Sequence, residues 1–141
     1  MALIVLDTSV FVSALISATG ASREVLRRCL EKKCAPAMGD KLLNEFEDVL
    51  GRKEIFETSP LSSAEREELF DAFVAVCQWV QVFFLWRPNL PDEGDNHVVE
   101  LAIACNAEAI VTLNTRDFGR GELQFPGLEV LTPAQFLRKT R

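Results

Sequence analysis

The amino-acid sequence predicts an α/β fold, a three-layer α/β/α sandwich with a central, mainly parallel sheet of about five strands. Short apolar runs alternate along the chain with longer amphipathic segments, a pattern typical of parallel strands joined by helical crossovers. The chain has 141 residues, 48% of them hydrophobic, which suits one ordinary domain with a substantial core. We therefore expect a single domain over residues 1–141.

The predicted strands are apolar runs without helical spacing. They cover residues 3–6, 34–38, 80–85, 108–113 and 128–131. Amphipathic segments predict helices at 9–17, 23–33, 40–51, from 62 onward, at 95–107 and at 133–140. Ser62 with Glu65, and Thr132 with Gln135, form capping boxes that mark two of the helix starts. Prolines and glycines predict loops at 87–94 and 114–127.

Composition narrows the functional classes. A net charge of −6 argues against general affinity for nucleic acid, unless acids gathered around a cation invert the local sign. A single histidine disfavours a zinc site or a histidine-based triad, and the four scattered cysteines predict reduced, mostly buried thiols. No apolar run reaches the roughly 18 residues of a membrane span. The N-terminus lacks signal-peptide features, which predicts a cytoplasmic protein.

Polar side chains follow two of the predicted strands. Asp7 comes directly after the strand at 3–6, and Asn114 and Asp117 follow the strand at 108–113. The carboxyl ends of parallel strands are where ligands bind in open α/β sheets. Because burying an isolated carboxylate costs several kcal/mol, we expect Asp7 to have a binding partner there.

Two predicted helices bring further acids. Asp95 lies within the apolar arc of the helix at 95–107, so it faces the sheet, although an N-cap role explains it equally simply. Asp92, in the preceding loop, is a weaker candidate. Glu45 and Glu47 both border the apolar stripe of the helix at 40–51, and the pattern does not choose between them. Either one is also explained as a solvated helix acid.

Converging carboxylates need a counter-ion. A pair about 4 Å apart repels by roughly 4 kcal/mol at an effective dielectric constant near 20. The sequence offers no histidine cluster and no neighbouring basic run to neutralise such a group. Oxygen-only ligands suit hard divalent cations, so we expect Mg²⁺ or Mn²⁺.

Five sequence motifs, taken together, resemble those of a known family. In order, "VLDTSVFVSAL", "GASREVL", "LLNEFEDVL", "DNHVVELAIACNAEAIVT" and "NTRDF" are similar to the motifs of PIN domains. The similarity is strongest to the bacterial branch of toxin components related to VapC, and it spans residues 3 to about 136. The resemblance implies an α/β/α sandwich and a Mg²⁺- or Mn²⁺-dependent ribonuclease.

The resemblance also assigns residues. It implies that the catalytic, metal-binding acids are Asp7, Glu45, Asp95 and Asp117, which selects Glu45 over Glu47. It implies supporting roles for Thr8, Ser9, Thr112 and Asn114. Many relatives carry Asp where Asn114 stands, so a second metal site should be weaker here. We therefore expect one firmly bound ion, with a second arriving with the substrate.

Several basic and apolar residues are candidates for binding the substrate or a partner protein. Arg116 and Arg120, near the expected site, are candidates for phosphate contacts. A basic stripe is expected either to guide RNA or to be an ordinary solvated helix face; it comprises Arg23, Arg27, Arg28, Lys32 and Lys33. His97 fits a phosphate or water contact as well as a helix-surface role. The resemblance implies an antitoxin partner and a homodimer, for which residues 70–86 supply apolar surface.

Two other functions compete with the nuclease. One is a catalytically weak or inactive PIN-type interaction module, for which Asn114 leaves room. The other is an aspartyl phosphotransferase with Asp7 as nucleophile. Many phosphatases of that kind carry a second Asp two residues later, where Ser9 stands here, and this disfavours the phosphotransferase.

Overall fold

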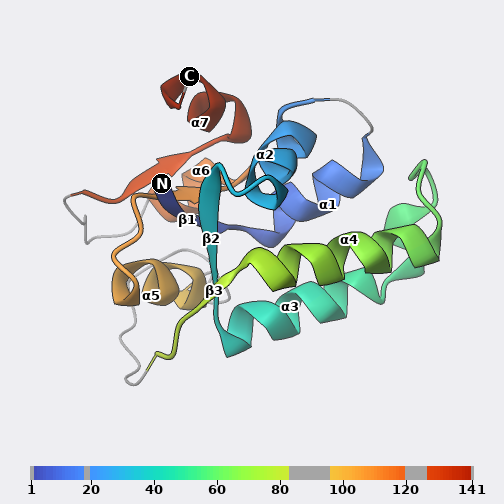
Figure 1. Ribbon diagram of the computed structural model, residues 1–141, viewed down its shortest axis with the longest axis horizontal. Helices are drawn as coiled ribbons and strands as arrows, with labels where there is room; N and C mark the ends of the chain where they lie inside the picture. The colour runs from blue at the N-terminus through green and yellow to red at the C-terminus, as the bar shows by residue number, and fades with distance from the viewer. Residues whose placement is uncertain (1, 18–19, 83–95, 120–126, 141) are drawn as a thin grey trace.

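The sheet is entirely parallel in the part of the chain that the structure describes. The computed structural model describes residues 2–17, 20–82, 96–119 and 127–140. The strand order is β3-β2-β1-β4-β5, and each neighbouring pair is parallel (Figure 1). The strands are β1 (Ala2–Leu6), β2 (Cys34–Met38), β3 (Gln78–Trp79), β4 (Ala109–Val111) and β5 (Glu129–Leu131). The predicted fold class is confirmed.

Helices cover the sheet on both sides. They are α1 (Thr8–Ile16), α2 (Ala21–Leu30), α3 (Asp40–Leu50), α4 (Ser63–Val76), α5 (Asn96–Ala104), α6 (Thr115–Gly119) and α7 (Pro133–Lys139), with a 3₁₀ turn, η1, at Lys53–Phe56. Figure 1 shows α2 and α7 together on one side, while α5 packs on β1 and β4 from the other. None of the described helices combines the length and apolar composition needed to cross a membrane.

Local sequence signals place several elements as predicted. β2 covers 34–38, as the apolar run indicated. At the start of α4, the Ser62 side chain accepts a hydrogen bond from the Glu65 backbone N–H, and the Glu65 carboxylate accepts one from the Ser62 N–H. Thr132 and Gln135 form the same reciprocal pair at the start of α7. Both capping boxes are therefore confirmed.

Two predicted segments differ from the structure. The strand predicted at 80–85 pairs earlier, at Gln78–Trp79, and residues 83–85 lie outside the described ranges. Its partner β2 ends at Met38 because α3 begins at Asp40, so the ladder has room only near the end of α4. The loop predicted at 114–127 contains one helical turn, α6, whose Phe118 is buried. Burial of one aromatic side chain outweighs the weak helical signal of a five-residue segment.

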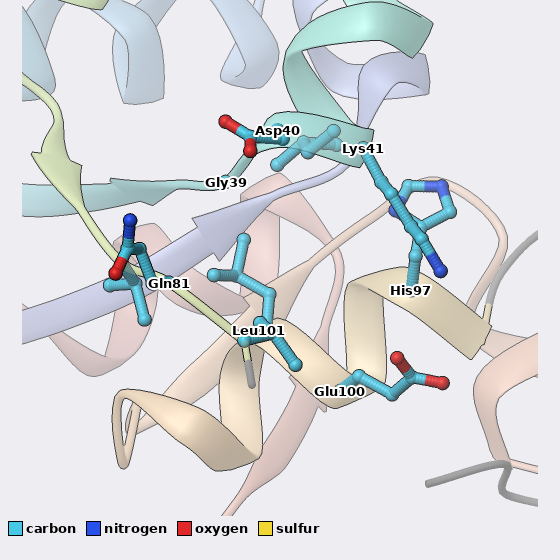
Figure 2. Close-up of a pocket in the computed structure, with 10 residues that line it drawn as sticks. Gly39, Asp40, Lys41, Gln81, His97, Glu100 and Leu101 are labelled. Atoms are coloured by element: carbon cyan, nitrogen blue, oxygen red, sulfur yellow. The ribbon is translucent and has the colours of Figure 1, made fainter. Parts of the chain in front are cut away.

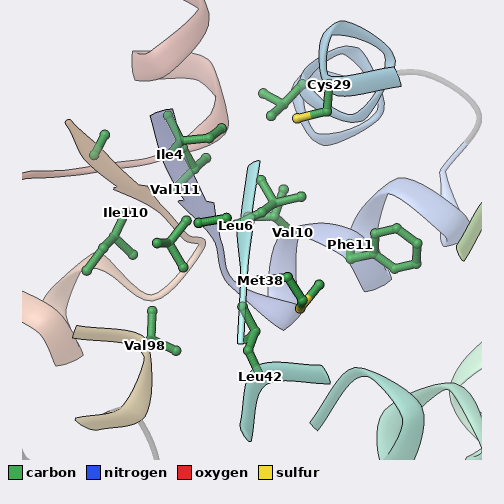
Figure 3. Packing of buried hydrophobic residues seen from close by; sticks show 14 of the residues in the cluster. Ile4, Leu6, Val10, Phe11, Cys29, Met38, Leu42, Val98, Ile110 and Val111 are labelled. Carbon is green, nitrogen blue, oxygen red and sulfur yellow. The ribbon is translucent and has the colours of Figure 1, made fainter. Parts of the chain in front are cut away.

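The core fixes α1 and α3 relative to the sheet. Figure 3 shows side chains of β1, β2 and β4 packed between α1 on one side and α5 on the other. Phe11 of α1 contacts Phe46 of α3 edge to face, with ring centroids 5.2 Å apart. Phe73 of α4 contacts both rings, at 5.2 and 5.8 Å. This aromatic cluster holds together the two helices that carry Thr8 and Glu45.

Candidate functional site

Asp7 occupies the junction between β1 and α1. Leu6 pairs with Val111 of β4, so Asp7 and Thr112 leave the sheet side by side at its carboxyl edge. The Asp7 backbone N–H donates to the Val111 carbonyl at 2.9 Å, and the side chain is only 4% exposed. Asp7 is the N-cap residue of α1, yet its carboxylate does not cap the helix. A buried acid that forgoes this common role must be held by other groups.

Two hydroxyl groups hold the Asp7 carboxylate. Ser9 Oγ donates to Asp7 Oδ2 at 2.8 Å, and Thr112 Oγ1 donates to the same oxygen at 2.7 Å. The hydroxyls are themselves oriented, because Ser9 Oγ accepts from the Leu113 N–H and Thr112 Oγ1 from the Asn114 N–H. No side chain of a described residue donates to Oδ1. That oxygen is therefore the one left for a cation.

Glu45 approaches the same region from α3. Thr8 Oγ1 donates to Glu45 Oε1 at 2.8 Å, and His97 Nε2 lies 2.5 Å from Glu45 Oε2. Partial burial raises the pKa of Glu45, but the hydrogen bonds from His97 and Thr8 and the charge on His97 outweigh it. The net pKa lies below its ordinary value, which favours the carboxylate form. Glu47 is exposed, so only Glu45 of this pair reaches the site.

Thr8 and His97 therefore support the second acid. Of the two hydroxyls in the D-T-S segment, Ser9 bonds to Asp7, while Thr8 bonds to Glu45. His97 is neither solvated nor free, because Nε2 faces Glu45 and Nδ1 is buried. A carboxylate accepts hydrogen bonds, so His97 Nε2 carries the proton between them.

Asp7 and Glu45 line one open pocket, here called the acid pocket, of about 520 Å³. Asn114 lies on its wall and is exposed, which is consistent with its predicted place beside Asp7. The remaining lining is Thr8, Ser9, Val12, Ser13, Ile16, Ser17, Val49 and Leu113. The pocket thus presents oxygen ligands on an otherwise largely apolar floor.

The donor set suits a hard cation but is incomplete within the described residues. No group of three or more His, Cys, Asp or Glu side chains able to hold a metal occurs among them. Asp95 lies outside the described ranges, and so does the side chain of Asp117, whose backbone belongs to α6. What is described, two carboxylates fixed by hydroxyl and imidazole donors, fits Mg²⁺ or Mn²⁺ chemistry.

The predicted substrate-binding arginines occupy different settings. Arg116 is exposed in the first turn of α6, two residues after Asn114. Arg23 Nε donates to the Ala14 carbonyl at 2.6 Å, so this side chain ties α2 to α1 and does not line the acid pocket. Arg120 lies outside the described residues.

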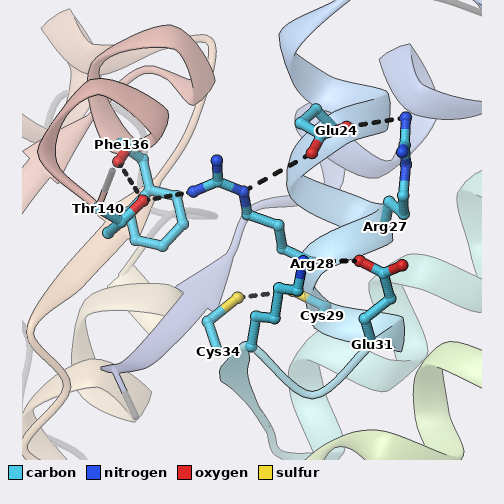
Figure 4. A network of polar contacts seen from close by, with 9 residues as sticks. Glu24, Arg27, Arg28, Cys29, Glu31, Cys34, Phe136 and Thr140 are labelled. Atoms are coloured by element: carbon cyan, nitrogen blue, oxygen red, sulfur yellow. Dashed lines mark hydrogen bonds and ion pairs between the residues drawn. The ribbon is translucent and has the colours of Figure 1, made fainter.

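Much of the basic stripe on α2 is paired within the chain (Figure 4). Arg27 forms an ion pair with Glu24 at 2.9 Å, and Lys33 with Glu31 at 3.5 Å. Arg28 donates to Thr140 Oγ1 at 2.7 Å, which links α2 to α7. These contacts favour the solvated-face interpretation of the stripe. The same view shows the side chains of Cys29 and Cys34 pointing toward each other. Both are free thiols, and their sulfur atoms lie 3.5 Å apart.

A second cavity of about 300 Å³ lies beyond His97 (Figure 2). Glu100 of α5, which the sequence analysis did not identify, lines this cavity, is 6% exposed, and has no hydrogen-bond partner for Oε1 among the described residues. An unsatisfied buried acceptor of this kind costs about 1–3 kcal/mol. The available signal was a charge interrupting the apolar run at 98–103.

A family model and a solved structure relate this chain to known proteins. The model of the PIN domain family matches residues 3–116. The chain belongs to the PIN-domain family. Its fold is similar to that of a chain in the crystal structure of VapBC2 from Rickettsia felis, bound to a DNA fragment from their promoter, with a TM-score of 0.60 and 16% identity. That match covers 92% of this chain and 98% of the other chain. No curated protein sequence matches significantly.

The Thr112 hydroxyl provides the first test of this PIN domain's site. Thr112→Val keeps the side-chain shape but removes the donor to Asp7 Oδ2 and the acceptor of the Asn114 N–H. We expect the free energy of unfolding to fall by about 1–3 kcal/mol, because the lost bond involves a charged group. Denaturant titration measures it. Thr58→Val, at an exposed position, is the control and should stay within about 0.5 kcal/mol of wild type.

The single histidine makes the contact between Glu45 and His97 directly observable. In ¹⁵N-resolved NMR spectra we expect the neutral ring to carry its proton on Nε2, because Glu45 accepts there. In Glu45→Ala this proton should exchange faster with water, whereas Glu47→Ala should leave the signal unchanged. A neutral ring protonated at Nδ1, or a signal indifferent to Glu45→Ala, would contradict the geometry.

Proposed function

We propose that this PIN domain is an endoribonuclease that hydrolyses RNA phosphodiester bonds with a carboxylate-bound Mg²⁺ or Mn²⁺ ion. The observation that carries the proposal is the pair of carboxylates in the acid pocket. Asp7 is buried at the end of β1 and fixed by two hydroxyls, and Glu45 is held by Thr8 and His97. No described cationic side chain other than His97 pairs with either acid. Two fixed carboxylates with so little cationic compensation among the described residues, at this edge of a parallel sheet, suit a divalent cation.

Four acids would hold the ion, namely Asp7, Glu45, Asp95 and Asp117. When bound, the ion lowers the pKa of water and offsets charge developing on the phosphate. The chain's own residues prepare the site. Ser9 and Thr112 fix one oxygen of Asp7, and the lowered pKa of Glu45 keeps it ionised at neutral pH. A rigid ligand shell of this kind reduces the reorganisation that catalysis would otherwise require.

An acidic protein can accept RNA here because charge acts locally. The net charge is −6, but a bound divalent ion would offset part of the negative charge of the acid pocket and would itself attract a phosphate oxygen. Arg116, exposed close to Asn114, is suited to a phosphate contact beside the ion, and we assign the same role to Arg120. Because Arg23 is engaged with the Ala14 carbonyl, we assign it at most an indirect role in RNA binding.

We further propose that the chain acts in the cytoplasm as the toxin of a type II toxin–antitoxin pair. The support is its PIN-domain family and the similarity of its fold to a chain of the VapBC2 complex. An antitoxin protein would then be its cognate partner. We also propose that the chain forms a single PIN-like domain and that two copies of it form a homodimer. Trp79 supports it, since this residue is 50% exposed on β3, the strand at the end of the sheet order.

The decisive assay is cleavage of a panel of structured and single-stranded RNAs with Mg²⁺, Mn²⁺ or EDTA. We expect metal-dependent cutting that falls at least roughly a hundredfold in Asp7→Asn and in Glu45→Gln, as expected for loss of a charged group in a catalytic site. Glu47→Gln, from the same helix, should cut like wild type.

Asp95→Asn, purified in parallel, controls for contaminating nuclease and should be inactive. Cutting that persists in Asp95→Asn would contradict the assignment. Folded wild-type protein that neither cuts RNA nor gains thermal stability with metal would favour an inactive interaction module, consistent with Asn114 in place of a carboxylate.

A further inference from the structure

The second cavity is a built site next to the acid pocket. It lies between the start of α3, the chain after β3, and α5. Figure 2 shows His97 and Glu100 projecting from α5, with Lys41 extending from α3 toward that helix. His97 belongs to both sites, because Nε2 bonds to Glu45 of the acid pocket while its ring lines this cavity. A ligand here would therefore lie against the side chain that orients a proposed catalytic acid.

Two buried polar atoms in this cavity lack a partner within the described part of the chain. Glu100 Oε1 and His97 Nδ1 have no hydrogen-bond partner among the described residues, and Glu100 is more than nine-tenths buried. The two residues are three apart on α5, so their side chains lie on one face of the helix. The two oxygens of a carboxylate accept hydrogen bonds, so Glu100 presents a pair of adjacent acceptors. The cavity thus offers two acceptors and calls for a ligand rich in N–H donors.

The walls define the rest of the ligand. Apolar side chains line the cavity on several sides; these are Leu42, Val80, Val82 and Leu101. A planar, largely apolar body with donors along one edge suits such walls and a volume of about 300 Å³. Nucleobases have this form, and proteins read unstacked bases through hydrogen bonds to their Watson–Crick edges. Among the four RNA bases, only guanine presents two adjacent donors, N1–H and the N2 amino group, on that edge.

The start of α3 offers a binding position for the phosphate group of a nucleotide. Gly39 caps α3 without a side chain, and Lys41 forms no ion pair with a described residue. A helix start with a nearby lysine attracts a phosphate. The same lysine disfavours the chief rival ligand, a basic side chain of a partner protein, although Asp40 on the cavity wall offsets part of its charge.

We propose that this cavity is a guanine-binding subsite, in which the Glu100 carboxylate accepts hydrogen bonds from the base and Lys41 contacts its phosphate. The inference rests on the proposed ribonuclease function, because it places one nucleotide of the RNA substrate beside the acid pocket. It makes Glu100 a specificity-determining residue and leaves the hydrolysis to the acids.

The first test measures binding of GMP, AMP, CMP and UMP by NMR titration in EDTA, so it does not depend on cleavage. Wild-type protein should bind GMP roughly tenfold more tightly than the other three. Glu100→Gln should abolish this preference, and Glu108→Gln, at an exposed position, should keep it. Lys41→Gln should weaken binding of all four nucleotides by a similar factor and preserve the order.

Folding and cleavage supply independent checks. Because Glu100 Oε1 has no hydrogen-bond partner among the described residues, exchanging one carboxylate oxygen for an amide group in Glu100→Gln breaks no such bond, so its melting temperature should not fall. If it does, Val82→Trp, at an exposed position on the cavity wall, should block GMP without disturbing a buried group. Cleavage by wild type should concentrate next to guanosines in a mixed RNA, and Glu100→Gln should cut at dispersed positions.

Several outcomes overturn the proposal. Equal affinity for the four nucleotides, or a guanine preference that survives Glu100→Gln, removes the subsite. Binding of an arginine-containing peptide that depends on Glu100, without any base preference, assigns the cavity to a basic partner segment. If wild type does not cut RNA but binds GMP through Glu100, the nuclease proposal fails and the guanine site stands.

Discussion

The structure depends on one buried charge, the carboxylate of Asp7 at the end of β1. An acid that is 4% exposed is tolerable only if its hydrogen bonds and counter-charge are provided. Ser9 supplies one hydrogen bond from the first turn of α1, and Thr112 supplies another from the end of β4. These contacts join two neighbouring strands at their carboxyl edge. They also leave one Asp7 oxygen oriented for a cation, so fold and proposed chemistry rest on the same contacts.

Local signals in the sequence determined much of the fold. The two capping boxes and the apolar run of β2 specify their elements through residues close in sequence, so they could be predicted. The short strand β3 and the single turn α6 could not, because their positions depend on the end of β2 and on burial of Phe118. Such short elements gain too little stability from local propensity for their sequence pattern to predict them.

The candidate site likewise contains residues that the sequence predicts and residues that only tertiary contacts identify. Asp7 is recognisable because a charge ends an apolar strand. Helical periodicity could not separate Glu45 from Glu47, and what distinguishes them is contact with Thr8 and His97, 37 and 52 residues away in sequence. Glu100 could not be predicted, because only the surrounding cavity shows that its Oε1 lacks a partner among the described residues. His97 lines this cavity and bonds to Glu45 of the acid pocket, which links the proposed choice of base to the proposed chemistry.

The measurement that tests the central claim most directly is Mn²⁺ binding, followed by electron paramagnetic resonance as the free-ion signal disappears. Our account predicts one firmly bound Mn²⁺ per chain, with affinity lowered at least roughly tenfold in Asp7→Asn and in Glu45→Gln, since even indirect supports of a metal site cost that much. Glu47→Gln should titrate like wild type. Wild-type protein that binds no Mn²⁺, or Asp7→Asn that binds it equally well, would contradict the account.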